Sequence, residues 1–162
     1  MDVLRTLLIG AAALAALPAV AAAHVVADPG RAEAGAYQAV VFRVGHGCGD
    51  AATTALRIEI PFEMASARPR PKPGWTLEIE RQDGRVAALT WRGHLPDDQF
   101  DEFAILFKLP DEPAALHFPT VQSCGSEQNR WTEIPLPGER ASHPAPSLIV
   151  TPKAASAETH QH

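Results

Sequence analysis

Several residue types are rare in this chain, and each scarcity argues against a class of function. Lys and Arg total 14 against 19 Asp and Glu, which gives a formal net charge of −5. That balance argues against a nucleic-acid-binding protein, because such a protein needs a basic patch. Only two methionines are present and one of them is Met1. This excludes a methionine-rich site for a soft metal ion.

Recognisable enzyme motifs are also missing. The sequence contains no G-x-S-x-G, no P-loop, no G-x-G-x-x-G and no H-E-x-x-H. Ser, His and Asp occur, but not in a spacing that indicates a catalytic triad. We therefore expect a binding protein rather than an enzyme.

Long apolar runs are confined to the first 23 residues. Arg5 is followed by an apolar run over 7–17 and by small residues at Ala21 and Ala23. This order is typical of a secretory signal peptide that is cut after Ala23. The apolar run is short for a membrane span, so we expect a soluble exported protein that begins at His24. The alternative is an uncut leader that tethers the domain to the membrane.

Two cysteines remain after the leader, Cys48 and Cys124. Because an exported protein meets an oxidising compartment, we expect them to form a disulfide. The rival is a thiolate metal site, although neither cysteine lies in a C-x-x-C motif.

The remaining chain reads as short strands separated by Pro and Gly. Alternating apolar residues predict an antiparallel all-β sandwich, immunoglobulin- or cupredoxin-like, over 24–151, with a disordered tail over 152–162 that contains His160 and His162. Asp83-Gly84 predicts a hairpin turn. The run over 103–109 is apolar at nearly every position, which predicts a central strand covered on both faces. The predicted strands cover 37–44, 55–60, 75–81, 86–91, 103–109, 116–122, 130–134 and 147–151.

His24 becomes chemically special if the leader is removed. Its α-amine and its imidazole Nδ1 could then bind one metal ion together, and both groups lose their protons near neutral pH. Nitrogen ligands of this kind favour Cu(II) among the common divalent metals. The alternative is that His24 is simply the residue after the cut.

Other possible ligands carry weaker signals. His46 lies in a Gly-rich turn beside Cys48, where we expect a surface role, with a metal role as the alternative. His117 lies within a predicted strand, where a structural role is expected. The tail histidines form H-x-H, which could bind copper or nickel loosely. The carboxylates that could supply oxygen ligands are Asp28, Glu33, Asp50, Glu102 and Glu133.

A series of short motifs resembles the YcnI-like family of exported copper-binding proteins. The resemblance covers nearly the whole region after the leader and depends on the order and spacing of the motifs. They are H-V-V-A-D-P at 24–29 followed by A-G at 34–35, H-G-C-G at 46–49 with T-T at 53–54, I-P at 60–61, K-P-G-W at 72–75, L-P-D-D-Q-F-D-E-F at 95–103, F-P-T-V-Q-S-C at 118–124 and N-R-W-T-E-I-P at 129–135.

This resemblance implies a β-sandwich that binds Cu(II) through the amine and imidazole of His24, a one-histidine version of the histidine brace. It also implies carboxylate ligands and a tryptophan beside the metal. Trp131 matches the tryptophan, and Glu33 and Glu102 are the candidate carboxylates. The family's acidic position after the first Pro is not matched directly, because Arg31 stands in that stretch and the acid is Glu33.

The expected function is therefore a periplasmic copper chaperone or carrier in copper uptake or homeostasis. It would pass Cu(II) to another exported copper chaperone or to a membrane copper transporter. Two other functions stay open at this point. One is an oxidative copper enzyme of the histidine-brace type, and the other is an adhesion or structural sandwich that uses no metal.

Overall fold

The computed structural model describes residues 24–154, and every regular element in that range is a β-strand. The predicted leader over 1–23 and residues 155–162, with His160 and His162, lie outside the described residues. Within 24–154 there is no helix of the length and apolarity needed to cross a bilayer. The strands are β1 Val26–Asp28, β2 Arg31–Glu33, β3 Tyr37–Val44, β4 Thr53–Glu59, β5 Ser66–Pro69, β6 Thr76–Gln82, β7 Arg85–Leu95, β8 Asp101–Lys108, β9 Ala114–His117, β10 Thr120–Cys124, β11 Glu127–Trp131 and β12 Ser147–Thr151.

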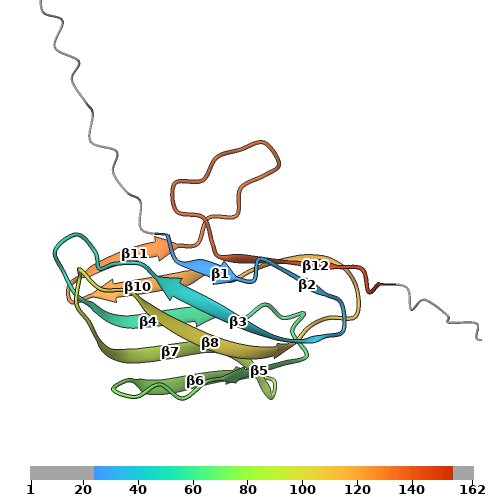
Figure 1. Ribbon diagram of the computed structural model, residues 1–162, viewed down its shortest axis with the longest axis horizontal. Coiled ribbons are helices and arrows are strands. Elements are labelled where there is room, and N and C mark those ends of the chain that lie inside the picture. Colours follow the sequence, from blue (N-terminus) through green and yellow to red (C-terminus); the bar gives the residue numbers. More distant parts are fainter. Residues whose placement is uncertain (1–23, 155–162) are drawn as a thin grey trace, which may run out of the picture.

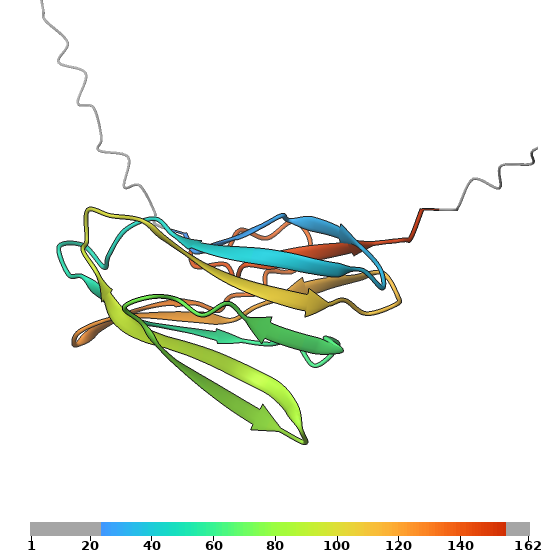
Figure 2. The ribbon, with the colours of Figure 1, turned by 60° about the horizontal axis from the view of Figure 1, so that its bottom comes forward.

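The strands form three sheets. One has the order β1-β3-β8-β5, a second has the order β11-β10-β4-β7-β6, and a third has the order β2-β12-β9. The first two are antiparallel throughout, and β2 pairs with β12 in parallel. Figures 1 and 2 show the layers facing each other, with β1 and β3 on one side and β4, β7 and β10 on the other. The predicted β-sandwich is confirmed.

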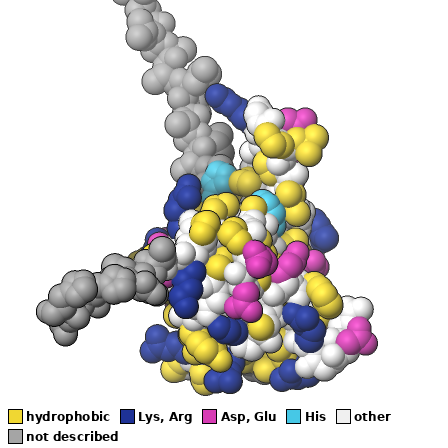
Figure 3. Space-filling model, turned by 90° about the vertical axis from the view of Figure 1, so that its right-hand side faces the viewer, with side chains coloured by type: hydrophobic (Ala, Val, Ile, Leu, Met, Phe, Trp, Pro, Cys, Tyr) yellow, Lys and Arg dark blue, Asp and Glu magenta, His cyan; other side chains and the backbone are white. Residues whose placement is uncertain are grey.

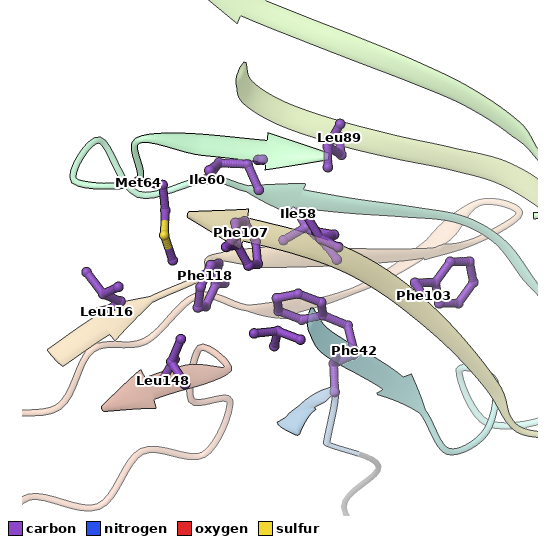
Figure 4. Close-up of a cluster of buried hydrophobic side chains, with 14 of the residues drawn as sticks. Phe42, Ile58, Ile60, Met64, Leu89, Phe103, Phe107, Leu116, Phe118 and Leu148 are labelled. Atoms are coloured by element: carbon purple, nitrogen blue, oxygen red, sulfur yellow. The ribbon is translucent and has the colours of Figure 1, made fainter. Parts of the chain in front are cut away.

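Alternation along each strand builds the core. Phe42 on β3 and Phe103 and Phe107 on β8 point inward from the first sheet and are fully buried. Phe118, between β9 and β10, packs edge-on against Phe42 with ring centroids 5.1 Å apart. Figure 4 shows Ile58 and Leu89 of the second sheet meeting this aromatic group from the other side. The period of two in the sequence therefore fixes which residues fill the space between the sheets.

The predicted hairpin at Asp83-Gly84 is confirmed. It connects β6 to β7, and both turn residues have positive φ, 50° for Asp83 and 79° for Gly84. Two-residue turns of this kind suit the right-handed twist of paired strands.

The prediction that the strand over 103–109 is covered on both faces is wrong. β8 is central in its sheet, between β3 and β5, but only its inward residues are fully buried. Leu106 on the outward face is 38% exposed. The physical reason is that the second sheet covers one face only, so the outward apolar residues face solvent.

The predicted disulfide is confirmed. Cys48, in the loop after β3, is bonded to Cys124 at the end of β10, 76 residues away. Closing a loop of this length stabilises the fold by about 4 kcal/mol in the chain-entropy model. The bond ties the loop between β3 and β4 to the end of β10 in the second sheet.

Candidate functional site around His24

His24 lies two residues before β1, the edge strand of the first sheet. The pairing of Val26 with Arg43 sets β1 beside the end of β3. Val25 is buried in the core, which fixes the backbone next to His24. The His24 side chain is exposed, and its imidazole lies against the indole of Trp131 with ring centroids 5.4 Å apart and planes inclined by 40°. His24 and Trp131 are therefore in contact, as the family resemblance predicts.

Trp131 is held in place by a buried amide. It is the last residue of β11 and is only 3% exposed. Its indole N–H donates to Oε1 of Gln122, 3.4 Å away, on the neighbouring strand β10. Gln122 is 1% exposed, and its NH₂ group donates to the backbone O of His46 at 2.8 Å and to Oγ1 of Thr53 at 2.7 Å. Because donors and acceptor of the amide are all used, the indole has a fixed position.

A loop over 132–146, here called the projecting loop, rises from the end of β11 (Figure 1). Its base is closed by backbone pairing. The N–H of Glu133 donates to the O of His143 at 3.1 Å, and the N–H of Ala145 donates to the O of Glu133 at 2.9 Å. His143 therefore lies at the fixed base of the loop rather than at its tip.

His143 also contacts Trp131. The two ring centroids are 5.1 Å apart and the planes are inclined by 39°. Trp131 thus has one imidazole contact from His24, just before β1, and another from His143 in the projecting loop. Two segments more than a hundred residues apart in the sequence therefore contact the same indole ring.

Glu133 is bonded to the same loop. Its carboxylate accepts hydrogen bonds from the backbone N–H of Ser142 at 2.9 Å and from the Ser142 hydroxyl at 3.1 Å. The backbone N–H of His143, followed by these Ser142 groups, lowers the pKa of Glu133 below its ordinary value. Such hydrogen bonds favour the charged form, so the carboxylate is held as an anion beside the imidazole of His143.

A shallow groove runs along this edge of the sandwich. It is lined by His24 to Ala27 on one side and by Pro144 to Ser147 on the other. Its walls are mostly apolar, and His24 lies within it. The groove leaves the imidazole of His24 accessible while its neighbours are packed.

Glu33, a predicted carboxylate ligand, lies at the other end of the molecule. It ends β2 and pairs with Thr151, just before β3 begins at Tyr37. His24 lies beside the far end of β3, so the eight-residue strand separates them by roughly 26 Å at about 3.3 Å per residue. Figure 3 shows the end of the molecule that is on the right in Figure 1, where acidic and basic side chains are interspersed. The extended course of β1 and β2 carries Glu33 away from His24.

Glu102, the second predicted carboxylate ligand, lies nearer to His24 than Glu33 does, but its carboxylate is paired with Arg43. It pairs across β8 and β3 with Arg43, which in turn pairs with Val26. Two strand spacings put the backbone of Glu102 about 10 Å from that of Val26. Oε1 of its carboxylate accepts a hydrogen bond from Nε of Arg43 at 2.9 Å, and Nη2 of the same guanidinium forms an ion pair with that oxygen at 2.9 Å. The structure therefore gathers neither predicted carboxylate at His24.

No three His, Cys, Asp or Glu side chains within 24–154 are clustered closely enough to hold a metal ion as they stand. Nδ1 of the His46 imidazole lies 2.7 Å from the backbone O of the next residue, Gly47. His117 ends β9 and is half-buried, in line with the structural role expected for it.

Sequence reasoning missed His143. Its place beside Trp131 depends on the path of the projecting loop, and no spacing rule gives that path. In the sequence, Trp131 and Glu133 are two residues apart within a predicted strand, which places them on one face of it but says nothing of His143. β11 ends at Trp131 instead of continuing to 134 as predicted, and Glu133 forms an isolated bridge with Pro144.

Comparison with known proteins agrees with this architecture. A family model described as a domain of unknown function (DUF1775) matches residues 24–150. The crystal structure of an uncharacterized protein from Nocardia farcinica, described as having an immunoglobulin-like fold, matches with a TM-score of 0.69 and 34% sequence identity, covering 78% of this chain and 97% of that chain. No protein of curated function matches the chain. The chain therefore belongs to the DUF1775 family, the family model of the YcnI-like proteins, and has an immunoglobulin-like β-sandwich fold.

Proposed function

We propose that the protein is an exported Cu(II) carrier that holds the metal at His24 after signal cleavage. The observation that carries the proposal is the placement of the His24 imidazole, exposed in a groove and in contact with the buried ring of Trp131. Removal of the leader after Ala23 would add the α-amine of His24 to the imidazole as a second nitrogen donor. The family match also starts at residue 24, the predicted first residue of the processed protein.

The donor set suits Cu(II) as cargo. Amine and imidazole nitrogens from one residue form a chelate, and Cu(II) prefers such nitrogen ligands. The disulfide removes both cysteine thiols from metal chemistry, which disfavours Cu(I). The shallow groove suits transfer, since a partner can approach His24 directly. We propose the periplasm as the place of action, and another exported copper chaperone or a membrane copper transporter as the recipient.

The decisive experiment compares two chains that differ by one residue. One begins at His24, and the other keeps Ala23 before it, so that the α-amine of His24 becomes an amide nitrogen. Cu(II) affinity is measured by competition against a chelator of known affinity. The proposal predicts one tight equivalent for the first chain and a loss of more than about 100-fold for the second, because one of two nitrogen donors is removed.

Equal affinity of the two chains would contradict the proposal. If copper binding then vanished in the His160→Gln/His162→Gln variant, the tail would be the copper site. If neither chain bound one equivalent of copper, the metal-free structural sandwich would be the better account. Oxidation of ascorbate by the copper-loaded protein, above a free-copper control, would instead favour an oxidative enzyme.

A further inference from the structure

His143 is a second imidazole in contact with Trp131. Its ring lies 5.1 Å from the ring of Trp131, and the ring of His24 lies 5.4 Å from the same indole. Trp131 is almost completely buried, whereas both histidines are exposed. Pro144, the next residue after His143, lines the same groove as His24.

The hydrogen bonds around His143 leave one ring nitrogen suited to a metal. The hydroxyl of Ser142 has one proton, which it donates to Oε1 of Glu133 at 3.1 Å. The same hydroxyl lies 3.3 Å from Nδ1 of His143, so it accepts a proton from that nitrogen. With the proton on Nδ1, the lone pair of the neutral ring is on Nε2.

This arrangement matches the supporting shell of histidine metal ligands. A ligating histidine usually donates its other ring N–H to a carboxylate, a backbone carbonyl or a water. Here the hydrogen bonds run from His143 Nδ1 through the Ser142 hydroxyl to Glu133, whose carboxylate also lies 3.8 Å from Nδ1.

We propose that this chain binds Cu(II) through two histidines, with the amine and Nδ1 of His24 and Nε2 of His143 as three nitrogen donors. The proposal rests on the proposed function, since it needs the amine that cleavage would expose. It requires only two residues, so it does not depend on a preformed group of three ligand side chains, and none is found in the described part of the chain. Glu133 and Ser142 are then positioning residues for His143, and neither Glu33 nor Glu102 is needed.

The test counts nitrogen donors by electron paramagnetic resonance with Cu(II) alone as the probe. All proteins begin at His24 and carry His160→Gln and His162→Gln, so that the tail contributes no imidazole. The test variant is His143→Gln. The matched control is His94→Gln, since His94 is also exposed but lies on β7, three strands away from β11 in the sheet order.

We expect nitrogen superhyperfine structure from three nitrogens in the parent and in His94→Gln, and from two nitrogens in His143→Gln. The Cu(II) affinity of His143→Gln should fall by more than about 10-fold, since loss of an outer-shell partner alone typically costs about 10- to 100-fold. Glu133→Gln should keep three nitrogens but weaken binding less, because it affects only the orientation of the ring. Circular dichroism confirms that each variant is folded.

Identical spectra and affinities for His143→Gln and His94→Gln would overturn the two-histidine site. If binding in those proteins were still lost on retaining Ala23, the proposed function would stand with His24 alone. If retaining Ala23 also had no effect, both proposals would fall. The two proposals therefore fail by different outcomes.

Discussion

Two tryptophans of the five-stranded sheet, Trp91 and Trp131, are both buried, but one has apolar neighbours and the other has polar neighbours. Trp91 on β7 is 0% exposed and packs against Phe103 with ring centroids 5.5 Å apart. Its indole N–H has no hydrogen-bond partner among the described residues. Trp131 on β11 is bonded to Gln122 and covered by two imidazoles. The first is a residue of the hydrophobic core, and the second links the core to a polar surface site.

The difference between the two tryptophans indicates how a β-sandwich can form a binding site at its surface without a deep cavity. The central strands of the sheet supply rigidity, and the edge strand β11 supplies a buried ring that the imidazoles of His24 and His143 contact. The buried amide of Gln122 connects that ring to Thr53 and to the backbone of His46, near the disulfide. His24 and His143 then lie against a ring whose position is already fixed by the buried amide.

Trp91→Ala should have the largest effect on stability and none on copper. Removing a fully buried indole leaves a cavity and costs about 3–5 kcal/mol of unfolding free energy. Urea denaturation measures the loss, and the Cu(II) affinity of the folded protein should match that of the parent within about twofold, which is about 0.4 kcal/mol. A parallel fall in copper affinity would mean that the two tryptophans are not independent.

Gln122→Leu should affect both stability and the site. The indole N–H of Trp131 and the backbone O of His46 lose their partner, which costs about 1–3 kcal/mol. With the ring less fixed, Cu(II) affinity should fall by about tenfold, as for other supporting groups of metal sites. Gln128→Leu on the exposed part of β11 is the control and should change neither quantity. Equal effects of the two substitutions would show that the buried amide does not position Trp131.

Trp131→Phe and Trp91→Phe compare the two environments directly. Both remove similar volume, but only Trp131→Phe leaves a hydrogen-bond acceptor, Oε1 of Gln122, without its donor. Trp131→Phe should therefore cost about 1 kcal/mol more than Trp91→Phe. Thermal and urea unfolding of the pair measure the difference. An equal or reversed order would contradict the structural role given to the Gln122 amide.

Glu102→Gln should have the smallest effect. The Glu102–Arg43 pair is solvent-exposed, so its loss should change stability by about 0.2–1 kcal/mol. Copper affinity should be unchanged, because the carboxylate is engaged by Arg43 on the outward side of the sheet. A loss of affinity similar to that of His143→Gln would restore Glu102 as a ligand and require that its ion pair opens on metal binding.

The fold was largely predictable because alternation reports burial directly. The hairpin at Asp83-Gly84, the inward rows of β3 and β4 and the Cys48–Cys124 bond all follow from local pattern or from the chemistry of exported proteins. The prediction that the strand over 103–109 is covered on both faces was wrong, because an apolar run does not show whether one or both faces of the strand are covered. Leu106 remains partly exposed for that reason.

The site was predictable only in part. The contact of His24 with Trp131 was expected from the family resemblance. The remaining neighbours depend on tertiary pairing, since the register of β1 against β3 separates Glu33 from His24, and the closure of the projecting loop brings His143 to Trp131. Short-range sequence patterns contain no information on either of these long-range arrangements.

The most direct test of the account is a crystal structure of the protein beginning at His24 with one equivalent of Cu(II), with anomalous diffraction recorded at the copper edge. The account predicts one strong peak between the amine and ring of His24 and the ring of His143, beside the indole of Trp131. A peak at Glu102, at the Glu33 end of the sandwich or only at the tail histidines would contradict it.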